Sequence, residues 1–529
     1  MKKYIFLLYG CFVGSTLLSA QNVTYSEHIA PIIYQKCTQC HRPNEAAPMP
    51  FTNYSEVKSW ANIIQYVTEI KYMPPWKPDP SFQHYLGENT LTDTEIQQIK
   101  DWVADGTPQG DPNLEPALPD FPEGSLLGEP DLVLSFAEAH QLTGNNVDEY
   151  RYFVLPTGLT EDKDIAAIEL RPGNTNLVHH ALFWNDDQGI AAAADAQTLE
   201  YGFQDSELGV SGITFEDQYP AYVPGSRPLE YNAPIGQKMK ANSDLLLQVH
   251  YAPTPYDETD SSSVNIFFAD KPISRYVQTY IMLPFFNTLL NGPFLIAANT
   301  VKEFHGVYTT PIDVSLVGVF PHMHKLGKKW EVFAVTPQND TLNIIRINEW
   351  DFNWQGTYFF EKMIKIPAGS TIHGLATYDN TTNNPDNPNN PPVFVTWGEK
   401  TSDEMYYLAF NWLPYQAGDE NLAPATSAAF TTDVVGTENF VLPKNKFYPI
   451  YPNPSNENCT ISYKLVEPTT ISIQVYNSLG ELVQTILQNT KQSNGYFQQK
   501  LDLSALAAGN YTVILTANKE KLSQSLIVP

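Results

Sequence analysis

The pattern of hydrophobic and polar positions divides the chain into a short helical part and a long part built from short strands. Within residues 55–72 apolar side chains recur at helical spacing. A second helix is predicted to begin at Thr92, where Glu95 completes a capping box, and to end at Gly106. From about Glu129 onward, short apolar runs alternate with Pro, Gly and Asn turns, which is typical of an all-β region. The pattern therefore predicts a mainly β, multidomain protein that begins with a small α-helical domain.

The N-terminus has the pattern of a secretory signal peptide. Met1 is followed by two lysines and by an apolar run that extends to Leu18, and we predict cleavage after Ala20. The alternative is lipoprotein processing at Cys11, which the bulky Tyr9 disfavours. No later apolar run is long enough to cross a membrane as a helix, so we expect a mature chain without a transmembrane segment.

Composition narrows the classes of function. The 529 residues include 58 acidic and 31 basic side chains, which give a formal net charge of −27. Binding to nucleic acid is not expected, because phosphate backbones would repel such a protein. The length suits about three to four domains of roughly 150 residues. The chain has only four cysteines, which excludes a disulfide-dense scaffold.

The helical part contains a haem attachment motif. Cys37, Cys40 and His41 form C-x-x-C-H, in which both thiols can form thioethers to haem and the histidine can bind its iron. A redox dithiol or half of a zinc site is the alternative, but no second cysteine pair exists to complete a zinc site. With its helices, the region of residues 21–112 resembles small class I cytochromes c.

That resemblance implies a methionine as the sixth iron ligand, which would raise the reduction potential. Met73, which precedes Pro74-Pro75-Trp76, is the preferred candidate. Met49 lies close to His41 in the chain and is less able to cross the haem, and an open sixth position is the remaining alternative. Residues 113–128, which follow the predicted haem domain, are rich in Pro and acidic residues and are predicted to be a linker.

Several histidines of the β region occur in pairs or at the ends of apolar strands. His322 and His324 would share one face of an extended strand and could converge on one metal. The adjacent His179 and His180 would point to opposite faces, so their joint use requires a bulge or a strand end. Imidazole suits copper, zinc, iron or nickel, whereas the thioether of Met405 is soft and stabilises Cu(I). Taken singly, each is more often an ordinary core or surface residue.

The order of these motifs resembles the type II copper, ascorbate-dependent monooxygenases, the family of peptidylglycine α-hydroxylating monooxygenase and dopamine β-monooxygenase. Within residues 132–429 the shared order is His-His, a strand ending in Leu-Gln-Val-His-Tyr, His-x-His and Asp-Glu-Met. The resemblance implies two consecutive jelly-roll β-sandwiches, one copper on each, facing across a solvent cleft. It also implies hydroxylation of a C–H bond with O₂. It assigns the electron-transfer copper to His179, His180 and His250, and the O₂-binding copper to His322, His324 and Met405.

Departures from the family limit what this resemblance says about the substrate. Peptidylglycine members have an Arg two residues before His-x-His for the substrate carboxylate, and here that position is Phe320. Their substrate contacts after the ligand methionine correspond to Tyr407 and Ala409. Since Phe320 and Ala409 cannot pair with a carboxylate, a peptide ending in glycine is a poor substrate prediction. The region also contains no cysteine, unlike the disulfide-bonded animal members.

The last part of the chain resembles the C-terminal sorting domain of the type IX secretion system of Bacteroidetes-type bacteria. The matching stretches are residues 451–454 (Tyr-Pro-Asn-Pro), 475–480 and 508–511, within a run of predicted strands. The alternative is a plain immunoglobulin-like binding module. Cys459 lies alone in this domain, and we expect it to be buried and unpaired.

The predicted organisation is a signal peptide, a haem domain, a linker, two copper-binding sandwiches and an immunoglobulin-like sorting domain. Their ranges are 1–20, 21–112, 113–128, 129–295, 296–432 and 445–529. We expect no ligand role for the remaining histidines, which match no ligand motif and are His28, His84, His140, His305 and His373.

The predicted function is that of a secreted copper monooxygenase with a covalently bound haem c. Its substrate, a small organic molecule or peptide, would react with O₂, and an ascorbate-like reductant or a redox protein would supply electrons. The fused haem would pass these electrons singly to the three-histidine copper. Two alternatives are a non-catalytic electron-transfer or copper-carrying protein, and a binding scaffold with empty sites.

Overall fold

The computed structural model describes residues 23–427 and 445–529. Short gaps within these ranges fall at residues 44, 46, 48, 120, 122–123, 205–209, 211, 214–217, 286–287, 448–449, 451–452, 456–457, 466–467, 479, 494 and 519. The predicted signal peptide, Cys11 included, therefore lies outside the described residues. Within them, none of the helices has the length and apolar character needed to span a bilayer.

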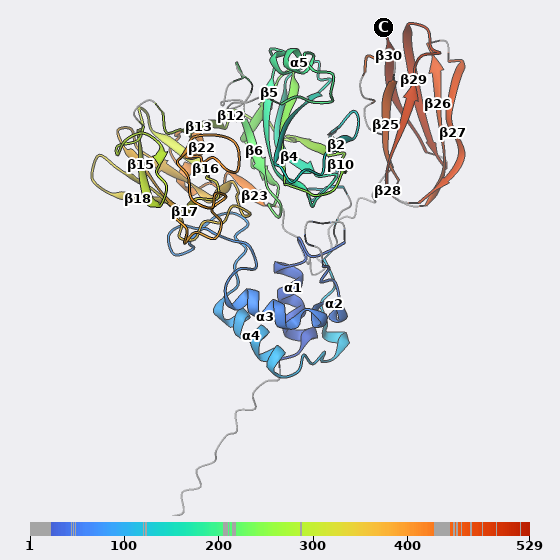
Figure 1. Ribbon diagram of the computed structural model, residues 1–529. Helices are drawn as coiled ribbons and strands as arrows, with labels where there is room; N and C mark the ends of the chain where they lie inside the picture. Colours follow the sequence, from blue (N-terminus) through green and yellow to red (C-terminus); the bar gives the residue numbers. More distant parts are fainter. Residues whose placement is uncertain are drawn as a thin grey trace, which may run out of the picture. The chain divides into compact units, whose positions relative to one another are not determined.

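The chain forms two compact units. Within the described residues, the helical unit contains residues 23–43, 49–74 and 91–118. The β unit contains the remainder, including residues 75–90, which are flanked on both sides by the helical unit in sequence. Figure 1 draws the helical unit in blue and the sheets of the β unit in green to red. The protein is thus mainly β with a small helical part, as the hydrophobic pattern predicts.

The helical unit is built around one hydrophobic core, which includes Tyr25, Ile33, Val57, Ile99 and Trp102. Its elements are η1 (Tyr25–Ile29), α1 (Ala30–Lys36), α2 (Tyr54–Ser59), α3 (Ala61–Glu69), α4 (Asp93–Ala104) and η2 (Pro112–Leu114). The helix predicted over residues 55–72 is thus interrupted at Trp60.

The capping box predicted at the second helix is present. The Glu95 amide donates to Thr92 Oγ1 over 3.2 Å, and the Thr92 amide donates to Glu95 Oε2 over 2.7 Å. This fixes the start of α4.

The first β domain consists of two sheets that share one core. The sheet β1-β11-β4-β8-β12 contributes Leu134 and Ile266, and the sheet β3-β9-β5-β6 contributes Phe183 and Leu247. The elements are β1 (Leu132–Ser135), β2 (His140–Leu142), β3 (Glu149–Pro156), β4 (Lys163–Arg171), β5 (Val178–Asp186), α5 (Ile190–Asp195), β6 (Gln218–Tyr222), β7 (Leu229–Tyr231), β8 (Ile235–Met239), β9 (Asp244–Tyr251), β10 (Glu258–Asp260), β11 (Ser263–Phe268) and β12 (Arg275–Tyr276).

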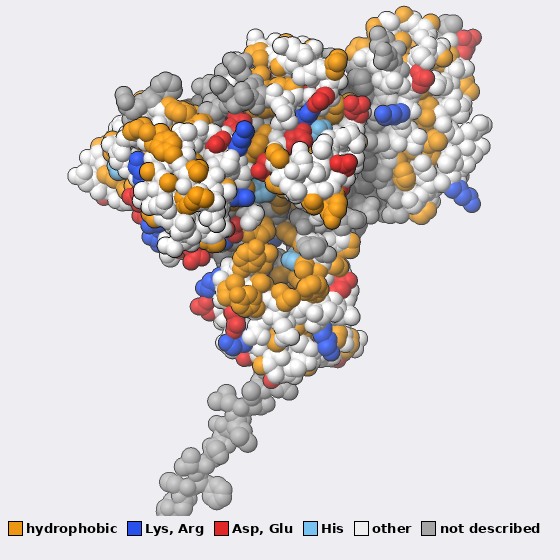
Figure 2. Space-filling model, viewed as in Figure 1, with side chains coloured by type: hydrophobic (Ala, Val, Ile, Leu, Met, Phe, Trp, Pro, Cys, Tyr) orange, Lys and Arg blue, Asp and Glu red, His pale blue; other side chains and the backbone are white. Residues whose placement is uncertain are grey.

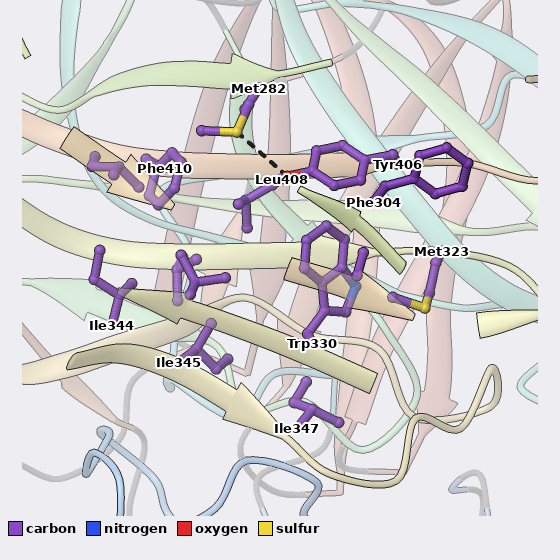
Figure 3. Packing of buried hydrophobic residues seen from close by; sticks show 14 of the residues in the cluster. Met282, Phe304, Met323, Trp330, Ile344, Ile345, Ile347, Tyr406, Leu408 and Phe410 are labelled. Atoms are coloured by element: carbon purple, nitrogen blue, oxygen red, sulfur yellow. Dashed lines mark hydrogen bonds between the residues drawn. The ribbon is translucent and has the colours of Figure 1, made fainter. Parts of the chain in front are cut away.

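The second β domain repeats this plan with the sheets β13-β22-β16-β19 and β15-β20-β17-β18. Figure 3 shows their shared core, in which Met282, Leu408 and Phe410 from one sheet meet Trp330 and Ile345 from the other. The elements are β13 (Gln278–Met282), β14 (Leu295–Ile296), β15 (Thr300–Thr309), β16 (Val314–His322), β17 (Gly327–Val335), β18 (Thr341–Ile347), β19 (Tyr358–Ile366), β20 (Thr371–Asn380), β21 (Val395–Thr396), β22 (Tyr407–Pro414), η4 (Asp419–Asn421) and β23 (Ala425–Ser427).

Strand pairing moves the boundary between the two β domains. We predicted the boundary at residues 295/296, but β13 pairs with β22 from Gln278↔Trp412 to Met282↔Leu408. The second domain therefore begins near Gln278. The sequence pattern gave no sign of this, because the pairing partner of β13 lies more than a hundred residues further along the chain.

The segment of residues 75–90, called the strap below, packs on the second β domain. Tyr85 is 1% exposed, belongs to that domain's core, and donates from its hydroxyl to the Ile344 carbonyl over 2.6 Å. Asp79 forms an ion pair with Arg346 at 2.7 Å, and the Leu86 amide donates to the Phe359 carbonyl over 2.8 Å. The prediction that residues 21–112 form one continuous haem domain therefore needs a correction, because these contacts remove the strap from it.

The C-terminal domain consists of the sheets β24-β25-β28 and β27-β26-β29-β30 around a core of its own. Cys459 is buried and unpaired, as expected. The strands are β24 (Lys446–Phe447), β25 (Asn458–Leu465), β26 (Thr469–Asn477), β27 (Leu482–Gln492), β28 (Gly495–Asp502), β29 (Gly509–Ala517) and β30 (Glu520–Val528). The jelly-roll and immunoglobulin-like connectivities stay predictions.

The motif residues of the C-terminal domain fix its turns. The Asn453 side chain donates from Nδ2 to the Ser525 carbonyl and accepts at Oδ1 from the Ile527 backbone amide. Gly480 has φ +77, a left-handed conformation that favours glycine, and its amide donates to the Asn477 carbonyl. Tyr451, Pro452 and Leu479 of the predicted motifs lie outside the described residues.

Candidate metal and haem sites

Two neighbouring strands of the first β domain bring three histidines together. His179 and His180 lie on β5 and His250 lies on β9, and these strands pair with His180 opposite His250. The register of the pairing shifts between Val178 and His180, which is the bulge that two adjacent histidine ligands require. One ligand atom of each histidine lies within 4.8 Å of the others, so the sequence-predicted residues of this site do converge.

The spacing of the Nδ1 atoms fits a shared metal ion. His180 Nδ1 lies 3.2 Å from His179 Nδ1 and 3.3 Å from His250 Nδ1. Two imidazole nitrogens, each about 2.0 Å from one tetrahedral ion, would be separated by about 3.3 Å. The single proton of an imidazole could serve only one of the two contacts of His180, whereas a metal would satisfy both.

Hydrogen bonding and burial leave these imidazoles in a metal-binding form. Asp148 Oδ1 lies 2.8 Å from His250 Nε2, and since a carboxylate only accepts, Nε2 carries the proton and Nδ1 keeps its lone pair. Burial lowers the pKa of His179 to about 3 and lowers the pKa values of His180 and His250. All three rings are therefore neutral at pH 7.

Two aromatic rings cover this histidine set. Tyr150 stacks on His250 with ring centroids 4.1 Å apart and planes 6° from parallel. Phe352, from the loop between β18 and β19, stacks on His179 at 5.0 Å and 22°. The set is thus enclosed by one ring from each β domain.

The second candidate site lies at the end of β16. His322 is the last residue of that strand, and His324 lies two residues further along the chain. Their ring centroids are 5.1 Å apart. Gln355 Oε1 accepts from His322 Nδ1, and the Asp403 carbonyl lies 3.2 Å from His324 Nδ1. Because both partners are acceptors, each Nδ1 carries the proton and each Nε2 is free to bind a metal.

Glu404 joins the two chain segments of the second site. Its side chain is fully buried and accepts from the backbone amides of His324, Leu326 and Met405. Burial raises the pKa of Glu404 to about 8, against the effect of these donors. The carboxyl group therefore links the loop after β16 to the segment that carries the predicted sulfur ligand, Met405.

A pocket that is open to solvent adjoins both histidine sets. Its lining includes Met405, His322 and His324, and it also includes His180, whose ring centroid lies 5.9 Å from that of His322. The other lining residues are mostly aromatic or apolar, with no Lys or Arg among them, and are Tyr150, Leu182, Trp184, Gln248, Phe320, Glu399 and Tyr407. Burial lowers the pKa of His322 and lowers that of His324 to about 4, so these imidazoles are neutral at pH 7 too.

In the helical unit, the C-x-x-C-H motif follows α1 directly. The His41 amide donates to the Cys37 carbonyl over 2.9 Å, and the His41 ring stacks on Phe51 at 4.3 Å. The Met49 carbonyl lies 3.0 Å from His41 Nδ1, which leaves Nε2 free for an iron. Neither Cys37 nor Cys40 takes part in a disulfide bond. This donor set fits a covalently attached haem.

The helical unit also has an exposed apolar face. Ile63, Tyr66 and Ile70 are 51%, 61% and 55% exposed, and they follow one another at helical spacing on and just after α3. Figure 2 shows hydrophobic side chains gathered on the visible face of this part of the molecule. Met73 is half-buried, and its amide donates to the Val67 carbonyl. Its role as sixth ligand stays a prediction.

The histidines without a ligand motif each have a protein partner. The pairs are His28 with Thr24, His84 with Glu88, His140 with Glu149 and His305 with His373.

The supporting residues Asp148, Phe352 and Gln355 were missed by sequence reasoning. Asp148 and Gln355 lie 102 and 33 residues from the histidines they contact. Glu404 is the middle residue of the Asp-Glu-Met motif, so the motif could have identified it as a supporting residue of the second site.

Comparison with known protein families identifies the C-terminal domain. A family model described as a secretion system C-terminal sorting domain matches residues 449–529. The chain is therefore exported by the type IX secretion system of a Bacteroidetes-type bacterium and is secreted or held at the cell surface. A search of the curated proteins finds no match.

Similar solved structures do not extend this identification. They include β-glucuronidases of Faecalibacterium prausnitzii (11% identity, TM-score 0.13, 43% of this chain and 37% of that chain) and Ruminococcus gnavus (8%, 0.14, 44% and 36%). The infectious bursal disease virus VP2 subviral particle is also among them (11%, 0.15, 60% and 81%). The chain spans little more than a third of the glucuronidases' length, and TM-scores this low carry no argument about its fold or function.

Proposed function

We propose that this exported chain is a copper-dependent monooxygenase that hydroxylates a C–H bond of a small organic or peptide substrate with O₂. The observation that carries the proposal is the convergence of three Nδ1 atoms at 3.2 and 3.3 Å beside a second His-x-His and methionine set. Two jelly-roll-type sandwiches, each with one copper site, are part of the proposal.

The proposal divides the chemistry between the two sites. Bound copper would supply O₂ activation at His322, His324 and Met405 and one-electron transfer at His179, His180 and His250. The thioether of Met405 favours Cu(I), the state needed before O₂ arrives. Haem bound at Cys37, Cys40 and His41, with Met73 as its predicted sixth ligand, would supply electrons one at a time. An ascorbate-like reductant or a redox protein would be the external donor.

The residues around the pocket orient the ligands and give the pocket a largely apolar wall. Asp148 and Gln355 fix which nitrogen of His250 and His322 carries the proton. Phe320 and Ala409 are 8% and 5% exposed and pack with Met405 and Tyr407 in one apolar cluster. The Tyr407 hydroxyl donates to Gln218 Oε1 over 3.2 Å and is not free to bind a carboxylate. These side chains favour a substrate without a negative charge.

Metal and haem analysis of the purified chain tests the proposal directly. We expect two coppers and one haem per chain, together with substrate-dependent O₂ uptake in a panel of uncharged aromatic and aliphatic compounds. Bound copper without any such uptake would support a non-catalytic electron-transfer protein instead. Copper near zero would support a binding scaffold and would overturn the proposal.

Replacing the predicted sulfur ligand tests the assignment of the second site. Met405→Leu keeps the side-chain volume but removes the thioether, so we expect hydroxylation to be lost while haem absorbance and the copper spectrum of the three-histidine site are unchanged. Met363→Leu, a change at another buried methionine of the same domain, is the matched control. Full activity in Met405→Leu would show that the site is assigned wrongly.

A further inference from the structure

The loop between β18 and β19, residues 348–357, contacts histidines of both candidate copper sites. Its Phe352 ring lies over His179 with centroids 5.0 Å apart and planes 22° from parallel. Three residues later, Gln355 Oε1 accepts from His322 Nδ1. A displacement of this loop would therefore disturb both sites together.

The conformation of the loop depends on Asp351. The Trp354 amide donates to the Asp351 carbonyl over 3.0 Å, and Asp351 Oδ1 accepts from the amide and side chain of Asn353 at 3.0 and 3.1 Å. These bonds form the turn that presents Phe352. The other carboxylate oxygen, Oδ2, lies 3.3 Å from Lys77 Nζ.

Lys77 belongs to the strap, which is itself anchored on the same domain. The side chains of Lys77 and Asp351 are only 16% and 20% exposed, so their ion pair is shielded from water more than a surface pair is. Two residues further on, Asp79 holds Arg346, and the Tyr85 hydroxyl donates to the Ile344 carbonyl. The strap thus presents Lys77 to the loop from a fixed position. In sequence, Lys77 lies four residues after Met73, the predicted haem ligand.

We propose that Lys77, Asp351 and Phe352 are positioning residues through which the strap sets the geometry of the three-histidine copper site. Lys77 holds Asp351, Asp351 holds the turn, and the turn holds Phe352 against His179. The inference rests on the proposed function for the identity of the bound metal. It adds that the strap, which is flanked in sequence by the helical unit, sets the geometry of the site that would accept electrons.

The test uses the full-length holoprotein with Lys77→Met, which keeps the aliphatic stem and removes the charge. We expect copper at the three-histidine site to bind about 10-fold more weakly in a chelator competition, with an altered cupric EPR spectrum. Haem absorbance should not change. Lys71→Met is the matched control, because the Lys71–Asp93 pair is 72% and 95% exposed.

A second substitution keeps the test decisive if Lys77→Met folds poorly. Phe352→Leu removes the stacked ring but leaves the ion pair, and we expect the same change in EPR spectrum and copper affinity. Wild-type spectra and affinities in both variants would overturn the inference and leave the proposed function standing. A wild-type protein that binds no copper would overturn both.

Discussion

The two candidate copper sites present opposite ring nitrogens. At His179, His180 and His250 the converging atoms are Nδ1, whereas at His322 and His324 the hydrogen bonds leave Nε2 free. The cause is the position of each second partner. Asp148 accepts from Nε2 of His250. At the second site, Gln355 and the Asp403 carbonyl accept from Nδ1 of His322 and His324.

The two sites also differ in how their ligands are assembled. The three histidines lie on the paired strands β5 and β9, so sheet register and one bulge bring them together. The second site combines the end of β16 with a segment about eighty residues later, which Glu404 fastens through backbone amides. One site is therefore fixed by the sheet, and the other by a single buried carboxyl group.

Replacing Glu404 should have the largest effect, because the second site is held together by this one carboxyl group. Glu404→Ala leaves three buried amides without their acceptor, which should cost about 3–5 kcal/mol and release copper from the second site. Glu404→Gln keeps an acceptor and should fall between this variant and the wild type. Urea unfolding and copper analysis measure both effects. Retention of two coppers in Glu404→Ala would show that the carboxyl group does not assemble the site.

Asp148→Ala should weaken the other site alone. Without the carboxylate, His250 can carry its proton on either nitrogen, so we expect copper at the three-histidine site to bind about 10–100-fold more weakly. Chelator competition followed by EPR separates the two sites. Gln355→Ala is the counterpart and should weaken only the second site. Equal losses at both sites in either variant would contradict the separate support described above.

The smallest expected effect concerns the anchoring of the strap. The side chains of Ser81 and Arg346 lower the pKa of Asp79 to about 2. This carboxyl group therefore contributes stability above pH 4, and the contribution is lost as the pH falls from about 4 to about 2. Asp79→Asn should cost about 1–2 kcal/mol at pH 7 and almost nothing at pH 2. Urea unfolding of the metal-free protein measures the difference, with Asp93→Asn as the exposed control. A pH-independent difference would contradict this assignment.

Local sequence signals anticipated the features whose cause is local. The capping box of α4 follows from neighbouring residues, and the type IX sorting domain follows from short turn motifs. The positions of Asp148 and Phe352 could not be anticipated, because they depend on how separate segments pack. The same holds for β13, whose assignment to the second domain depends on β22.

The strap also constrains how the protein can be assembled. Tyr85 meets its partner Ile344 across 259 positions of the chain, so closing this contact requires a long loop and comes late in folding. Until the second β domain has been made, the Trp76 and Tyr85 rings have no core to enter. A fragment that stops after residue 112 would carry both aromatic rings on its surface and would be prone to aggregate. Expression of the helical unit by itself therefore calls for replacing residues 75–90 with a short polar linker.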